Sequence, residues 1–161
     1  MVKQGSSPLD DPLNILLIGI LKGFTTSMWR VSGEGSGGVS RAFGEDLWNL
    51  MNARATSVGV EMDKSSPESA MVVFSKFLTD IYQSAEEIEY EVGENSLEMT
   101  VKNCKLHNLT DFLDENNVPR SVGCPYALTA IALMEDVTGE PFIIDNIKSE
   151  NGNSKIVIKQ L

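Results

Sequence analysis

The chain has 161 residues, with 23 acidic and 13 basic side chains and a formal net charge of −10. Such a charge repels phosphate backbones and anionic headgroups, which argues against charge-driven binding to nucleic acid or to a membrane surface. Two cysteines are too few for a disulfide scaffold and indicate a reducing compartment, so we expect a cytoplasmic protein. We expect one domain over residues 1–161, of which residues 1–7 form a loose tail.

The first predicted helix follows Asp11 and Pro12, an N-cap residue and a first-turn proline. From Leu13 to about Trp29 it is apolar on most of its surface at the N-terminal end, which is typical of a buried helix. The apolar run stops at Lys22, short of the ~20 apolar residues that a membrane crossing needs. We therefore expect no membrane span.

The glycine-rich segment 32–38 predicts a flexible turn between this helix and a second one over 39–52. It lacks the Gly-Lys-Ser/Thr ending of a phosphate-binding loop, and a helix rather than a strand precedes it. A third helix is expected over 65–82, because Pro67 and Glu68 follow a serine that can cap it.

Four strands are predicted by alternating or continuous apolar patterns, over 88–92, 97–101, 141–147 and 154–161. The last two flank an Asn-Gly pair, which is a strong hairpin signal. A polar helix and an apolar helix lie between the second and third strands. The pattern predicts an α+β fold, with N-terminal helices packed on a four-stranded antiparallel sheet and a helical pair inserted between two hairpins.

Three residues have the character of metal ligands, namely Cys104, His107 and Cys124. They would supply three of the four ligands of a structural zinc site. The alternative interpretation is two buried thiols and a surface imidazole. Cys124 also precedes an apolar helix, whose positive end can lower the pKa of a thiol and make it a nucleophile, with His107 as its base.

Aromatic and methionine side chains flank the glycine-rich segment and recur on the later apolar helix. They either form core or line an apolar pocket, which would suit a hydrocarbon-like or aromatic ligand. The candidate ligand-binding residues are Phe24, Met28, Trp29, Phe43, Trp48, Met51, Tyr126 and Met134.

The order of features over residues 97–161 is strand, cysteine, helix, Gly-Cys, helix, glycine and hairpin. This order resembles the 4-vinyl-reductase-type hydrocarbon-binding domains, which share a fold with vesicle-tethering (TRAPP) subunits and, more distantly, with haem-based nitric-oxide sensors. The resemblance implies an apolar ligand pocket between helices and sheet, and a homodimer. Haem is not expected, because His107 does not match the helix that carries the haem ligand in those sensors.

The resemblance also bears on zinc. Family members that hold zinc use a cysteine near the start of the second helix, a carboxylate in the next strand and two cysteines at the final hairpin. Cys124 and Asp145 match the first two positions, whereas Lys148 and Lys155 stand near the others. Zinc therefore remains possible only through a different ligand set.

The leading functional hypothesis is a stand-alone, non-enzymatic module that encloses a small apolar ligand. Two alternatives remain open from the sequence. One is a minor thiol-dependent reductase-like or hydrolase-like enzyme that uses Cys104 or Cys124. The other is a TRAPP-like assembly scaffold, which predicts a wide exposed apolar patch instead of a cavity.

Overall fold

The computed structural model describes residues 12–161, so the tail expected over residues 1–7 lies outside the described residues. The first helix, α1, spans Pro12–Ser32, and a 3₁₀ turn, η2, follows at Gly33–Ser36. The second helix, α2, spans Gly37–Ala55. The predicted turn between two helices is confirmed, but it is short and helical, because α2 already begins within the glycine-rich segment.

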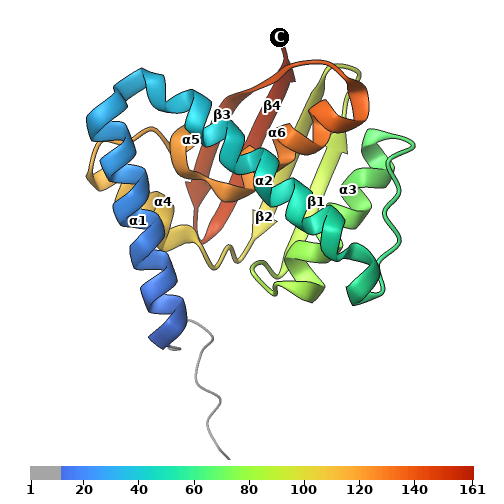
Figure 1. The fold of residues 1–161 in the computed structure, drawn as a ribbon, viewed down its shortest axis with the longest axis horizontal. Helices are drawn as coiled ribbons and strands as arrows, with labels where there is room; N and C mark the ends of the chain where they lie inside the picture. Colours follow the sequence, from blue (N-terminus) through green and yellow to red (C-terminus); the bar gives the residue numbers. More distant parts are fainter. Residues whose placement is uncertain (1–11) are drawn as a thin grey trace, which may run out of the picture.

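The prediction that α1 is a buried helix is wrong. Thr25 is its one fully buried residue, whereas large apolar side chains such as Leu16, Ile20 and Phe24 are exposed. The reason is visible in Figure 1, where α1 runs along one side of the molecule and extends past it. It packs on the short helices of the inserted segment rather than on the sheet.

The third helix is confirmed as α3, Pro67–Lys76, which continues as a π-helical turn, η4, at Phe77–Ile81. Its start follows the capping prediction, because the Ser66 side chain accepts a hydrogen bond from the backbone N–H of Ser69 at 3.1 Å. A short 3₁₀ turn, η3, at Thr56–Val58 ends the preceding helix.

The sheet consists of β1 Glu87–Val92, β2 Ser96–Lys102, β3 Phe142–Glu150 and β4 Asn153–Gln160, in the spatial order β1-β2-β4-β3. All three pairings are antiparallel. Asn151 and Gly152 both have positive φ in the turn of the second hairpin, as the Asn-Gly signal predicts. The α+β class and the two hairpins are therefore confirmed.

The segment between the hairpins forms α4 at His107–Glu115, the short α5 at Arg120–Gly123 and α6 at Pro125–Thr138. Every residue of α6 from Tyr126 to Met134 is buried. The helix ends at Gly139, whose left-handed conformation (φ 75°) suits a glycine C-cap. The helix that is apolar on all sides and buried is thus α6, not α1.

The layers follow from this burial. Figure 1 shows α6 in front of the sheet and α2 in front of α6, and the contacts between elements agree, since α2 packs mainly on α6 while α6 also contacts β3, β4 and α3. The main hydrophobic core lies between sheet and helices and includes Phe74, Phe77, Phe142, Ile156 and Ile158. A smaller cluster beneath α1 contains Leu109 and Leu113.

Within residues 12–161, no helix combines the length and the apolar character that crossing a bilayer requires.

The contact between α2 and α6 generates a stability prediction. A Cβ on Gly44 would lie 2.6 Å from the carbonyl carbon of Leu128, so Gly44→Ala must push the two helices apart. We expect the substitution to lower the free energy of unfolding by about 2 kcal/mol in denaturant titrations. Gly38→Ala is the control, because it lies in the same helix with open space around it and should change stability by less than about 1 kcal/mol. Equal effects of the two substitutions would contradict this account of the contact.

Candidate functional site

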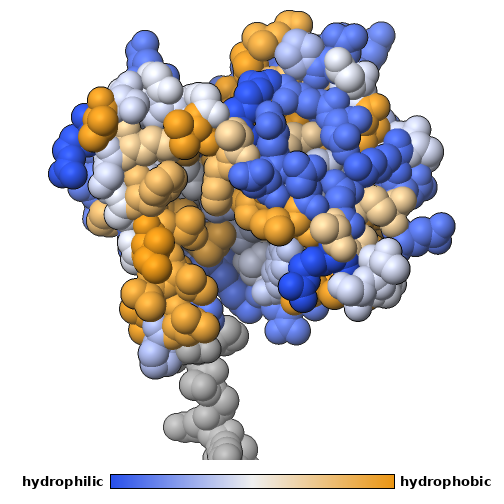
Figure 2. Space-filling model, in the orientation of Figure 1, coloured by the Kyte–Doolittle hydropathy of each residue, from blue (hydrophilic) through white to orange (hydrophobic). Residues whose placement is uncertain are grey.

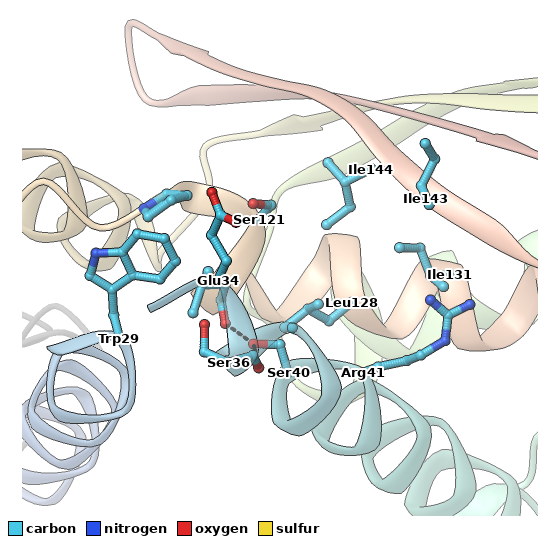
Figure 3. Close-up of a pocket in the computed structure, with 13 residues that line it drawn as sticks. Trp29, Glu34, Ser36, Ser40, Arg41, Ser121, Leu128, Ile131, Ile143 and Ile144 are labelled. Atoms are coloured by element: carbon cyan, nitrogen blue, oxygen red, sulfur yellow. Dashed lines mark hydrogen bonds between the residues drawn. The ribbon is translucent and has the colours of Figure 1, made fainter. Parts of the chain in front are cut away.

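A cleft of about 380 Å³ lies where the end of α1, η2 and the start of α2 face α5, α6 and β3 (Figure 3). Most of its walls are apolar, with a few polar side chains among them. Its lining consists of Trp29, Glu34, Ser36, Gly37, Ser40, Arg41, Pro119, Ser121, Val122, Leu128, Ile131, Ile143 and Ile144.

Two serines fix the wall formed by η2 and α2. The Ser36 hydroxyl donates to the carbonyl of Gly33 at 2.7 Å and so closes the 3₁₀ turn. The buried Ser40 hydroxyl lies 2.8 Å from the carbonyl of Val122, which it reaches across 82 residues of sequence. This buried hydrogen bond joins α2 to α5, and both of its residues line the cleft.

Two charged side chains line the cleft, and Figure 3 shows Arg41 at the opposite end from Trp29 and Glu34 between Trp29 and Ser121. The Arg41 guanidinium forms an ion pair with Glu135 of α6 and donates to the carbonyl of Phe142 at 3.3 Å. Glu135 also accepts from the backbone N–H of Phe142 at 2.7 Å. This network joins α2, α6 and the first residue of β3, and it places a guanidinium beside apolar walls.

The candidate ligand-binding residues are separated into three places. Trp29 lines the cleft, at the end opposite Arg41. Phe24, Met28 and Phe43 surround a neighbouring crevice between α1 and α2, with a volume of only about 20 Å³. Those buried in the main core are Trp48, Met51, Tyr126 and Met134.

Some cleft residues carried no signal in the sequence. Arg41 is one of 13 basic residues and belongs to no recognisable motif, and Ile143 and Ile144 appear as ordinary strand residues. The fold brings these three residues together, because β3 begins beside the C-terminal part of α6 and α2 packs on α6. The one usable signal was the glycine-rich segment, whose turn forms one end of the cleft.

The two cysteines lie in a different region, and both are buried free thiols. Burial raises the pKa of the Cys124 thiol to about 11, although backbone N–H groups of Ala127 and Tyr126 oppose the rise. Burial likewise raises the pKa of the Cys104 thiol, which interacts with Tyr126 and Ser154. The expectation that the helix start lowers the pKa of Cys124 is therefore wrong, because desolvation outweighs the helix end.

His107 is half-buried at the start of α4, where its Nδ1 lies 2.9 Å from the backbone carbonyl of Cys104 rather than at a thiol. In the described part of the chain, no three His, Cys, Asp or Glu side chains are arranged to hold a metal ion. The structure thus does not gather Cys104, His107 and Cys124 into a zinc site.

These thiols generate a prediction about reactivity. At pH 8, a pKa of about 11 leaves about one part in a thousand of Cys124 as thiolate, and burial also blocks access. We expect iodoacetamide to modify neither cysteine of the folded protein at pH 8 and to modify both in denaturant, as measured by mass spectrometry. Rapid modification of Cys124 in the folded protein would contradict the burial argument and revive its role as a nucleophile.

The chain is similar to a protein from Methanothermobacter thermautotrophicus (strain Delta H) that is called "Putative rubredoxin". It is 29% identical over 154 residues, which cover 94% of this chain and 75% of the relative.

The name raises the question of iron. A tetrahedral iron site of the rubredoxin type takes four cysteine thiolates, whereas this chain has two cysteines, both buried as thiols of raised pKa. The residues present do not fit such a centre.

A family model matches nearly the whole chain. The model described as "Putative rubredoxin C-terminal domain" matches residues 13–161, from the first turn of α1 to the last residue. The chain therefore belongs to the putative rubredoxin C-terminal domain family.

Proposed function

We propose that this domain is a small-molecule-binding module whose ligand occupies the cleft between Trp29 and Arg41. The observation that carries the proposal is the cleft itself. Its volume of about 380 Å³ falls within the ~300–1,000 Å³ of small-molecule sites. Such sites combine mostly apolar walls with a few placed polar groups, and this lining has that composition.

The walls indicate the class of ligand. Leu128 and Ile131 of α6 and Ile144 of β3 present aliphatic side chains, while Trp29 contributes an aromatic ring at one end. Apolar walls favour a flat or elongated apolar ligand, and an indole can stack on an aromatic one. This agrees with the hydrocarbon-like or aromatic ligand implied by the resemblance to 4-vinyl-reductase-type domains.

The polar groups at the other end suggest one hydrogen-bond acceptor on the ligand. Both hydrogen bonds of Arg41 start from its Nη2, so the guanidinium has further N–H donors to offer. Its charge is already offset by Glu135, which favours a neutral or weakly polar acceptor over a strongly anionic one. The Ser121 hydroxyl on α5 adds a second polar group to the lining.

The thiol-dependent enzyme is less well supported. Neither Cys104 nor Cys124 belongs to the lining of the cleft, and both thiols have raised pKa values. A nucleophile must reach its substrate and its base, which buried thiols beside Tyr126 do not. A binding role makes no such demand on the cysteines.

The experiment is a matched pair of substitutions at Ser121, which is exposed on the short helix α5. Ser121→Trp should fill the cleft, while Ser121→Ala leaves it open. We expect the purified wild type and the alanine variant to bind the uncharged fluorescent probe N-phenyl-1-naphthylamine with equal affinity, and the tryptophan variant to bind it at least about tenfold more weakly.

Native mass spectrometry provides a second measurement. Extra mass that survives in the native spectrum of the wild type, disappears on denaturation and is missing from Ser121→Trp would identify a resident ligand of the cleft. Equal probe binding by both Ser121 variants would place the probe elsewhere and contradict the proposal.

A further inference from the structure

We propose that the ligand of the cleft is an amine, whose cationic ammonium group lies at the end formed by Trp29 and Glu34. This inference rests on the proposed function, because it names the chemical class of the ligand of that same cleft. It starts from the placement of charge, with Glu34 beside Trp29 at one end and Arg41 at the other (Figure 3). Figure 2 shows the wider surface, where apolar and hydrophilic side chains both reach the face of the molecule.

The carboxylate of Glu34 is the unbalanced charge of the cleft. Among residues 12–161, no basic side chain forms an ion pair with it. Arg41, in contrast, is paired with Glu135. The cleft therefore carries an excess of negative charge, and this excess lies at the Trp29 end.

A polar groove adjoins this end of the cleft, with Ser121 in the lining of both. Its charged side chains already have partners. Arg120 pairs with Asp114 at 2.5 Å. Asp145 pairs with Lys159 at 3.0 Å. The groove thus supplies no free cation to the neighbouring carboxylate, and a ligand can supply one.

The indole of Trp29 suits the same cation. Trp29 is half-buried and packs against the small cluster beneath α1, while its ring also lines the cleft. A tryptophan face attracts an ammonium group within about 6 Å of the ring centre. The adjacent carboxylate adds a Coulomb attraction, which is stronger beside apolar walls than in bulk water. A neutral group gains neither attraction, and an anion is repelled.

The opposite end of the cleft sets the orientation of the ligand. The Arg41 guanidinium repels a cation, so the ammonium group is directed to Glu34 and the apolar body lies along Leu128 and Ile131. The net charge of −10 also attracts cations to the molecule as a whole.

An organic amine fits this end better than a metal ion does. Hard metal ions take several oxygen ligands, whereas the described part of the chain has no group of three side chains arranged to hold one. An ammonium group needs only one carboxylate and one aromatic face, which Glu34 and Trp29 supply.

The test compares three compounds that share one apolar body and differ in their end group, namely 4-phenylbutylamine, 4-phenylbutan-1-ol and 4-phenylbutyrate. Each is titrated against the full chain carrying the fluorescent probe N-phenyl-1-naphthylamine, and displacement of the probe gives the affinity. We expect the wild type to bind the amine at least about tenfold more tightly than the alcohol, and the carboxylate most weakly.

Glu34→Gln removes the charge and keeps the shape of the side chain. It should weaken the amine about tenfold and leave the alcohol within about twofold. Glu61→Gln is the matched control, because Glu61 is also exposed but follows the far end of α2 and does not line the cleft. It lowers the net charge equally and should leave both affinities within about twofold.

Trp29→Leu tests the aromatic face separately. The leucine keeps an apolar wall but has no ring, so the amine should lose about threefold more affinity than the alcohol. Far-UV circular dichroism establishes that each variant is folded.

An alcohol that binds as tightly as the amine overturns the inference, as does equal weakening of the amine by Glu34→Gln and Glu61→Gln. Failure of all three compounds to displace the probe overturns it too. The cleft is tested separately by Ser121→Trp, which should weaken the probe and all three compounds alike. Probe binding that Ser121→Trp abolishes, without any preference for the amine, would refute the amine and leave the cleft as the binding site.

Discussion

The burial of α6 between α2 and the sheet is the constraint on which the rest of the structure depends. From Tyr126 to Met134 this helix has no solvent-facing residue, so it must be covered on both sides. Gly44 allows α2 to approach the backbone of α6 closely. At the C-terminal end of α6, Glu135 pairs with Arg41 and Asp136 accepts a hydrogen bond from the Trp48 indole at 2.8 Å. Close packing and paired polar groups together fix how α2 lies over the core.

The cleft and the exposed apolar side chains of α1 are both consequences of this arrangement. Because α2 packs along α6, the chain turns at η2 between α1 and α2. As a result, α1 packs on α4 and α5 instead of the sheet. The space between this turn, α5 and the edge strand β3 is the cleft. Within residues 12–161, the outer side of α1 stays open to solvent, where Leu16 and Ile20 are exposed. The same helix thus contributes Trp29 to the cleft and exposes apolar side chains elsewhere.

The cysteines show how burial decides between two effects of opposite sign. Cys124 stands immediately before α6, where the helix end and backbone N–H groups favour a thiolate. The same close packing that makes α6 a core helix removes water from this position, and the pKa of Cys124 rises to about 11. Because desolvation of a full charge outweighs the fractional charge of a helix end, this thiol serves as a small core residue.

The sequence by itself determined the local structure, namely the capped helix starts, the Asn-Gly hairpin, the alternating strands and hence the α+β class, because these depend on neighbours within a few residues. It also presented two apolar helices, α1 and α6, with no means of telling which one is buried. Only the tertiary structure decided that α6 is buried and α1 exposed, and that Trp29 and Arg41 line a cleft whereas Trp48 lies in the core. The physical reason is that the spacing of apolar residues shows which face of a helix is apolar but not which element covers that face. A face buried in the core and a face exposed at the surface therefore have the same sequence pattern.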